Sequence, residues 1–237
     1  IGLSTELPDP PPTRSQLLRA VAFRRSLPAA YRLHDMAADA MGVLDALDIE
    51  RAHVVGMSMG GMIAQQAAID FPARVTSLVS IMSSTGSRRV GQPTPKVMRA
   101  SMRRPEPTPE TAVEQSLEFF AGICGPTFDA AAFRELALAS FRRSYRPEGT
   151  ARQLAAIIAS GDRTAELREL DVPTLVIHGL ADTLVRPSGG VATAKAVPGS
   201  RLLMFNDMGH DLPHTRHDEM AAAIRANVTR SGAPVAA

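Results

Sequence analysis

The 237-residue sequence lacks several features that would set it apart from ordinary globular domains. It has a single cysteine, Cys124, so it cannot form an internal disulfide, and this fits a reducing compartment. No apolar run approaches the roughly 18 residues that a membrane-spanning helix needs. The first residues do not have the basic and apolar regions of a signal peptide. We therefore expect a cytoplasmic protein without membrane contacts.

An excess of charge of one sign is also missing. The 26 Lys and Arg residues and the 24 Asp and Glu residues leave a net charge of +2, which is too small to indicate nucleic-acid binding. No group of His, Cys, Asp and Glu has the spacing of a metal site, so we expect neither a metal nor a cofactor. The length is ample for one domain with its own core, and nothing in the composition indicates an oligomeric state.

The most informative segment is the sequence GMSMGG at residues 56–61, a G-x-S-x-G pattern centred on Ser58. Residues 52–55 before it form a short apolar run that is typical of a buried parallel strand, and residues 62–69 after it have the composition of a helix. A strand, a sharp turn and a helix are the context in which this pattern presents a nucleophilic serine. We therefore predict that Ser58 is a catalytic nucleophile.

The same turn predicts two further features of the backbone. The N–H of Met59, the residue after the serine, is expected to face the oxyanion that forms during acyl transfer. Gly56 and Gly60 are expected to be required, because side chains there would collide where the strand and the helix pass closely.

Strands alternating with helices predict a mostly parallel α/β sheet with helices on both faces. The strands after the first are expected at residues 75–82, 172–179 and 201–205, and the flanking helices at residues 33–48 and 218–228. No strand-like segment precedes residue 52. We therefore expect that the fold is incomplete at its N-terminal side.

The alternation stops between residues 86 and 165. Four helices are expected there, at residues 94–104, 109–122, 129–143 and 148–160. A helical block between two strands predicts a cap over the sheet edge where the ligands of open α/β sheets bind. The predicted domains are a core of residues 1–85 and 166–237 and a helical cap of residues 86–165.

A nucleophilic serine needs a histidine to take its proton and a carboxylate to orient that histidine. In α/β-hydrolases these follow in the order Ser, acid, His. Asp182 lies in the loop after the third predicted strand, and His210 lies in the loop after the fourth. Both loops leave the same edge of a parallel sheet as the serine turn, so we predict that Asp182 and His210 complete a triad with Ser58.

Rival assignments are less favourable. Asp207 lies three residues before His210 but follows the wrong strand for the acid, and Asp171 precedes its strand. His214 and His217 lie at or near the start of the last predicted helix, where surface positions are the simpler interpretation. The other histidines and the cysteine are interpreted as structural or surface residues: His34, His53, His178 and Cys124.

An apolar substrate pocket is expected around the triad. Met57 and Met208 flank the predicted site and could line a flexible acyl pocket, although core packing is an equally good interpretation. Four phenylalanines in the predicted cap could also line it, and packing between helices would explain them as well: Phe119, Phe120, Phe133 and Phe141.

These motifs resemble those of the capped α/β-hydrolases. GMSMGG, GLAD at residues 179–182 and GH at residues 209–210 are similar to the three signatures of that family, over nearly the whole chain. Residues 170–177 and 208–213 are similar to the aclacinomycin methylesterase-like bacterial esterases, and residues 1–5 resemble the end of an early loop in that branch. The resemblance implies an eight-stranded sheet and a second oxyanion donor from an N-terminal His-Gly loop. This sequence contains no match to that loop.

The resemblance and the triad together predict a serine carboxylesterase that hydrolyses a small carboxylic ester. The alternatives on the same fold are a lactonase, a carbon–carbon bond hydrolase and a perhydrolase or acyltransferase. A ligand-binding protein with little turnover is an alternative of another class.

Overall fold

The computed structural model describes residues 7, 10–23, 27–103 and 107–232. Residues 1–5, which resemble an early loop of the family, lie outside this part. The described strands form one parallel sheet in the order β1 (Ala52–Met57), β2 (Val75–Ile81), β3 (Thr174–Gly179) and β4 (Arg201–Phe205). Val55 lies opposite Val79, Val79 opposite Leu175, and Ile177 opposite Leu203. The predicted parallel α/β class is confirmed.

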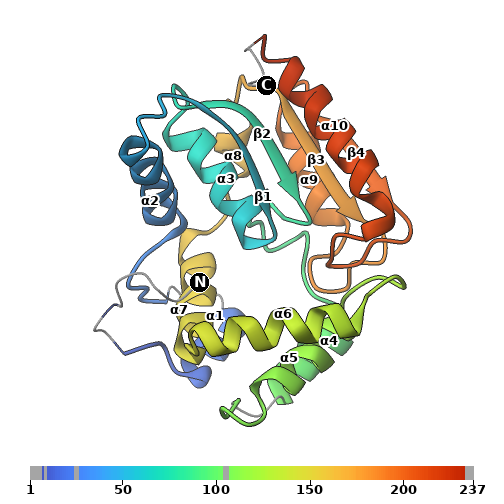
Figure 1. Cartoon of the computed structure of the whole chain (residues 1–237). Coiled ribbons are helices and arrows are strands. Elements are labelled where there is room, and N and C mark those ends of the chain that lie inside the picture. The colour runs from blue at the N-terminus through green and yellow to red at the C-terminus, as the bar shows by residue number, and fades with distance from the viewer. Residues whose placement is uncertain (1–6, 8–9, 24–26, 104–106, 233–237) are drawn as a thin grey trace.

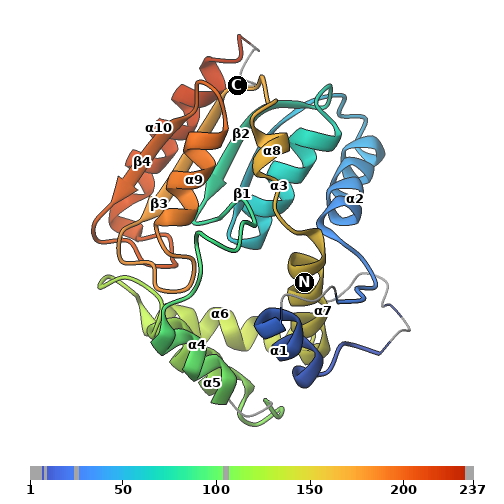
Figure 2. The same ribbon diagram turned by 180° about the vertical axis from the view of Figure 1, so that it is seen from behind.

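Helices cover both faces of this sheet (Figures 1 and 2). One face carries α2 (Leu33–Ala46), α3 (Met59–Asp70), α8 (Thr164–Leu167) and α9 (Ser188–Ala196). The other face carries α10 (His217–Thr229), which follows the short 3₁₀-helix η1 (His214–Arg216).

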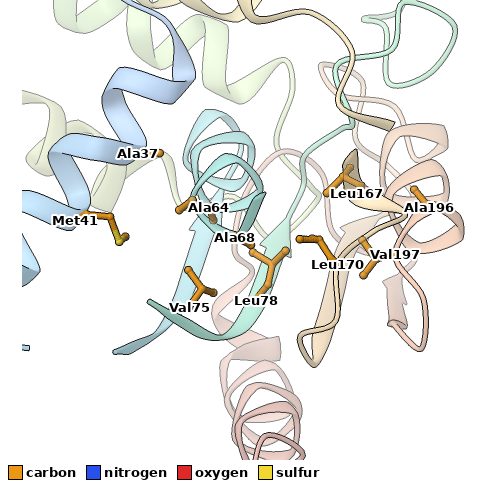
Figure 3. Close-up of a cluster of buried hydrophobic side chains, with 11 residues drawn as sticks. Ala37, Met41, Ala64, Ala68, Val75, Leu78, Leu167, Leu170, Ala196 and Val197 are labelled. Carbon is orange, nitrogen blue, oxygen red and sulfur yellow. The ribbon is translucent and has the colours of Figure 1, made fainter. Parts of the chain in front are cut away.

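Strand β2 contributes to the cores on both faces because successive side chains of a strand point in opposite directions. Leu78 packs with Ala64 and Ala68 of α3 in the first core, which Figure 3 shows. Its neighbour Val79 belongs to the second core, together with Met220 of α10. The two cores hold the sheet between its helical layers, so the loops at its ends start from fixed positions.

The segment between β2 and β3 is helical, as predicted. It contains α4 (Pro95–Arg103), α5 (Ala112–Ala121), α6 (Ala130–Arg143) and α7 (Pro147–Ser160), and we call residues 86–165 the helical insertion. The arrowheads of the strands point toward this layer of helices (Figure 1), so the insertion lies beyond the carboxyl edge of the sheet. The Asp129 carboxylate accepts hydrogen bonds from the N–H groups of Ala131 and Ala132 and caps the start of α6.

Helix α1 (Arg14–Phe23) was not predicted, and its position differs from the predicted domain division. Residues 1–85 were assigned to the core, but Ala20 of α1 packs with Leu27 and with Ala155 of α7. Both views place α1 beside α7, away from the sheet. The α1 helix therefore extends the layer of the insertion instead of covering the sheet.

The two ends of the insertion touch each other, and we call this contact the hinge contact. Arg163 donates from its backbone N–H to the Thr85 carbonyl over 2.8 Å and from its guanidinium to the Ser84 carbonyl over 3.1 Å. The Thr164 hydroxyl donates to the Thr85 hydroxyl over 2.9 Å. Arg163 is buried, and burial lowers the pKa of its guanidinium to about 10. A buried side chain thus joins the chain entering the insertion to the chain leaving it.

Within the described ranges, no helix combines the length and apolar character needed to cross a bilayer.

Candidate active site

Three polar side chains meet at the carboxyl edge of the sheet. Ser58 follows β1, Asp182 follows β3 and His210 follows β4. The His210 Nε2 atom lies 2.8 Å from the Ser58 Oγ atom, and the His210 Nδ1 atom lies 2.8 Å from the Asp182 Oδ2 atom. The imidazole therefore stands between a hydroxyl and a carboxylate, an arrangement that can take a proton from the hydroxyl while the carboxylate fixes the ring.

The turn that carries Ser58 has an unusual backbone. Ser58 has φ 54° and ψ −121°, a conformation that is costly for a residue with a side chain. Its N–H donates to the Ile81 carbonyl over 2.9 Å, which ties the turn to the end of β2. The helix α3 begins at the next residue, so the serine stands at the junction of strand and helix with its hydroxyl toward His210.

The glycine requirement differs in part from the prediction. A Cβ atom on Gly56 would collide with the carbonyl of Gly60, as expected for this close crossing. A Cβ atom on Gly60 would meet no described atom within 4 Å, so the expected steric need for Gly60 is wrong. The tight position is Gly61, whose added Cβ would lie 2.7 Å from the Ser83 Cβ atom. It is α3 packing against the segment after β2 that excludes a side chain here.

Met59 is the first residue of α3. The first N–H groups of a helix have no carbonyl one turn earlier to bind, and they point toward the N-terminal end where partial positive charge accumulates. The Met59 N–H therefore has the orientation and the local field that suit an anionic oxygen bound to Ser58.

The Asp182 carboxylate is held on both oxygens. It is 2% exposed, and its Oδ1 atom accepts the N–H groups of Leu184 over 2.9 Å and Val185 over 2.8 Å. Its Oδ2 atom faces His210. These bonds fix the plane of the carboxylate, so they also fix the direction from which it meets the imidazole.

His178 lies behind this carboxylate. Its Nε2 atom donates to the Val185 carbonyl over 2.7 Å and lies 3.6 Å from Asp182 Oδ2. Its Nδ1 atom finds no hydrogen-bond partner among the described residues. Burial lowers the pKa of His178, so a neutral ring fills the space beneath Asp182. This burial and the bond to Val185 agree with its interpretation as a structural histidine.

The loop that carries His210 is bonded to the helical insertion. The His210 N–H donates to the Ile123 carbonyl over 2.9 Å, just after α5. The Asp211 Oδ1 atom accepts the N–H groups of Gly125 and Gly209, each over 2.9 Å. The sequence patterns assigned no role to Ile123 or to Asp211, although Asp211 lies in the segment 208–213 that resembles the esterases, because these contacts join two loops far apart in the chain.

Cys124 belongs to the same contact. Its Sγ atom lies 3.7 Å from the His210 carbonyl oxygen, and burial raises the pKa of the thiol to about 12. A thiol that keeps its proton at neutral pH is a poor nucleophile. The interpretation of Cys124 as a packing residue agrees with this environment.

The rival residues have other partners or other places. Asp207 forms an ion pair with Arg216, with 3.1 Å between Oδ2 and Nε. Asp171 lines a depression of about 590 Å³ at the opposite edge of the sheet, where the strands begin. His214 and His217 are exposed in η1 and at the start of α10.

The predicted pocket residues separate into three groups. Met57 ends β1 and is 55% exposed, and its contact with substrate stays a prediction. Met208 is 0% exposed and packs in the second core, so its assignment to a substrate pocket is wrong. Its side chain fills the space between the sheet and α10.

The four predicted phenylalanines are partly buried in the helical insertion. The Phe120 ring of α5 lies 4.7 Å from the Phe133 ring of α6, between centroids, and Phe119 meets Phe120 edge-on at 5.8 Å. Phe141 packs on Tyr145 at 5.0 Å. These rings join α5 to α6 and form the end of α6, and their contact with substrate stays a prediction.

The described ranges of the chain contain no group of three or more His, Cys, Asp or Glu residues that could hold a metal ion.

Comparisons with known proteins give consistent similarities. A profile described as the alpha/beta hydrolase fold matches residues 4–216. Rhodomycin D methylesterase DnrP of Streptomyces peucetius is 30% identical over 218 residues, which cover 83% of this chain and 73% of that protein. A 2-hydroxy-6-oxononadienedioate/2-hydroxy-6-oxononatrienedioate hydrolase of Pseudomonas sp is 30% identical over 207 residues, covering 83% of this chain and 70% of that enzyme. The solved structure of a hydrolase from Pseudomonas aeruginosa PA01 matches with a TM-score of 0.63 at 24% identity, over 88% of this chain and 74% of its own.

Proposed function

The chain belongs to the alpha/beta hydrolase fold family, and from this premise we propose that it is a serine carboxylesterase acting on a small carboxylic ester. The observation that carries the proposal is the unbroken line of hydrogen bonds from Ser58 through His210 to Asp182. The fold alone would not support it, because this fold hosts many chemistries. A hydroxyl bonded to an imidazole, which a carboxylate orients in turn, is suited to acyl transfer.

In the first half-reaction the Ser58 Oγ atom attacks the ester carbonyl carbon while His210 Nε2 takes the hydroxyl proton. Asp182 holds the Nδ1–H of the ring and stabilises the imidazolium. The Met59 N–H donates to the oxyanion of the tetrahedral intermediate. The bond between the carbonyl carbon and the alcohol oxygen then breaks, His210 returns the proton to that oxygen, and Ser58 remains acylated.

In the second half-reaction a water molecule replaces the alcohol. His210 takes a proton from the water as its oxygen attacks the acyl carbon, and a second tetrahedral intermediate forms at Ser58. Its collapse breaks the bond to the Ser58 Oγ atom, which regains a proton from His210. The carboxylic acid leaves, and the starting hydrogen bonds are restored.

The first substrates to test are methyl esters of small carboxylic acids. A relative whose name states methylesterase activity is 30% identical over 83% of this chain, which favours an ester with a small alcohol. Carbon–carbon bond hydrolysis is the second candidate, because a hydrolase of a 2-hydroxy-6-oxo dienedioate has the same identity over the same share of the chain. The two reactions differ in the bond that breaks.

The test compares wild type with Ser58→Ala on p-nitrophenyl esters of two to twelve carbons, on methyl esters and on a 2-hydroxy-6-oxo dienoate. We expect ester turnover in wild type and a loss of at least about 10³-fold in Ser58→Ala. A fluorophosphonate should label one peptide, which contains Ser58. Labelling that persists in Ser58→Ala would contradict the proposal, and turnover of the dienoate alone would favour the second candidate.

The acid is tested by a matched pair of carboxylates. Asp182→Asn should lower kcat strongly because it removes the charge that orients His210, whereas Asp207→Asn should lose only an ion pair with Arg216. Steady-state kinetics at one pH measures both. A larger loss in Asp207→Asn would show that the acid assignment is wrong.

A further inference from the structure

The loop of residues 207–211, which we call the histidine loop, forms hydrogen bonds with two parts of the molecule. One is the loop after β3, and the other is the helical insertion. On the side of β3, the Met208 carbonyl accepts the N–H of Ala181, next to Asp182. On the insertion side, the Ile123 carbonyl accepts the N–H of His210 and the Asp211 carboxylate accepts the N–H of Gly125. The imidazole therefore stands on a backbone that two different parts of the molecule hold.

Asp211 closes this contact with one oxygen atom. Its Oδ1 atom accepts the N–H of Gly125, from the insertion, and the N–H of Gly209, from the histidine loop, each over 2.9 Å. The shared acceptor sets the spacing between the two N–H groups. Asp211 is only partly exposed and comes directly after His210, so it bridges the loops at the residue next to the imidazole.

The two loops approach closely enough to exclude side chains. A Cβ atom on Gly125 would collide with the Asp207 carbonyl and lie 2.9 Å from the Gly209 nitrogen. A Cβ atom on Gly209 would collide with the backbone of Cys124 and lie 2.7 Å from the Ile123 carbonyl oxygen. Contact of backbone on backbone leaves little slack, so a shift of one loop shifts the other.

We propose that Asp211 is a positioning residue, which clamps the segment 123–125 of the helical insertion onto the histidine loop and thereby holds His210 between Ser58 and Asp182. The inference rests on the proposed function, because it assigns a role to the place of the base. It adds that the distances from His210 to Ser58 and Asp182 depend on the contact between the helical insertion and the histidine loop.

A clamp of this kind acts on turnover more than on substrate affinity. The Asp211 carboxylate accepts hydrogen bonds from backbone N–H groups of both loops. It would therefore affect turnover only through the position of the imidazole ring of His210, the preceding residue. A small displacement of that ring weakens its bonds to Ser58 and Asp182, and displacements near 1 Å cost about 10²-fold in rate. The substrate's own contacts would be unchanged, so KM should change little.

The first experiment compares three single variants with wild type. Asp211→Ala removes the shared acceptor, Asp211→Asn keeps a carbonyl oxygen at the same place, and Asp207→Ala removes a carboxylate of the same loop that lies outside the clamp. We expect Asp211→Ala to lower kcat by about 10-fold to 10²-fold with KM within about twofold, and Asp211→Asn to recover most of the loss. Asp207→Ala should stay near wild type.

A glycine pair tests the same contact without touching a carboxylate, and it decides the matter if Asp211→Ala does not fold. Gly125→Ala introduces the collision with the histidine loop, whereas Gly122→Ala in the same connection meets its nearest atom at 3.4 Å. Gly125→Ala should lower kcat and slow fluorophosphonate labelling of Ser58, while Gly122→Ala should do neither. Melting temperatures identify any variant whose loss comes from unfolding.

The outcomes are separable. Wild-type kcat in both Asp211→Ala and Gly125→Ala would overturn the positioning role. If Ser58→Ala still lost its activity, the proposed function would stand. Equal losses in Asp211→Asn and Asp211→Ala would also overturn it, because the charge and not the shared acceptor would matter. Full activity in Ser58→Ala would instead defeat the proposed function itself.

Discussion

The imidazole of His178 makes the stability of the fold depend on pH. Burial lowers its pKa first of all, the bond to Val185 and the nearby Asp182 oppose this, and His210 adds to it. In the unfolded chain the ring titrates near its ordinary value of about 6.5. Between that value and the lower folded pKa, the unfolded state binds more protons than the folded state. The contribution of His178 to stability is therefore fully present above about pH 6.5 and is lost as the pH falls through the folded pKa.

We predict that His178→Gln reduces this dependence. Glutamine keeps an N–H donor for the Val185 carbonyl and has no charge to gain. Urea unfolding at pH values from about 7.5 to 5 should show a shallower fall of the unfolding free energy in the variant than in wild type. His217→Gln, at the exposed start of α10, is the matched control for loss of an imidazole. An unchanged slope in His178→Gln would assign the dependence to other groups.

The sequence predicts the place of a single residue where the order of the strands and a local motif are enough to fix it. Ser58, Asp182 and His210 were placed together because each follows a strand of one parallel sheet, and their side chains do meet. Met208 and Gly60 were misjudged because the outcome depends on which neighbours occupy the space. Position along the chain gives no information about those neighbours.

At the scale of elements, α5 and α6 are joined by the ring contacts of Phe119, Phe120 and Phe133. We predict that truncating these rings or Phe141 shifts the preferred acyl length, because each removes apolar surface from the insertion. The change in discrimination should be about 1–3 kcal/mol for each methylene-sized step.

The measurement is kcat/KM across esters of two to twelve carbons for the four alanine variants. Leu136→Ala, an exposed leucine of α6, is the control for loss of an apolar side chain on the same helix. A chain-length profile that stays at wild type in all four variants would show that the rings serve only to pack α5 against α6.

Elements with a strong apolar period were predicted well, whereas the helices α1, α8 and α9 were not predicted. Helix α9 begins with Ser188, Gly189 and Gly190, which are poor helix formers. An added Cβ on Gly190 would lie 2.5 Å from His178 Nδ1, and one on Gly189 would lie 2.9 Å from the Ser83 carbonyl. Tertiary packing has overridden the low helix propensity of these residues.

Strand β3 starts at Thr174, two residues later than predicted, because Pro173 has no N–H to donate.

For the whole molecule, the hinge contact ties the helical insertion to the sheet. Besides the Ser84 carbonyl, the Arg163 guanidinium reaches Gln65 Oε1 on α3 at 3.3 Å. The Gln65 amide in turn donates to the Ser80 hydroxyl over 3.0 Å. Removing the guanidinium would leave buried acceptors without a donor, and each such group is costly.

We predict that Arg163→Met lowers the unfolding free energy by about 2–4 kcal/mol. Methionine keeps the length and loses the donors. Arg168→Met, an exposed arginine at the end of α8, is the matched control and should stay within about 0.5 kcal/mol of wild type. Urea denaturation measures both. Equal stability of Arg163→Met and wild type would mean that water replaces the guanidinium without cost.

The order of the strands along the chain has a consequence for biosynthesis. The sheet grows in sequence from β1 to β4, and 152 positions separate Ser58 from His210. A ribosome therefore completes the serine turn long before it makes the imidazole that would activate it. Until β4 pairs with β3, His210 is not held beside the Ser58 hydroxyl, so under the proposed mechanism the growing polypeptide would not react with esters. The ability to hydrolyse esters would arise in a single late step, when the segment with β4 and His210 packs onto the sheet. Nascent chains would not be acylated by esters in the surrounding medium.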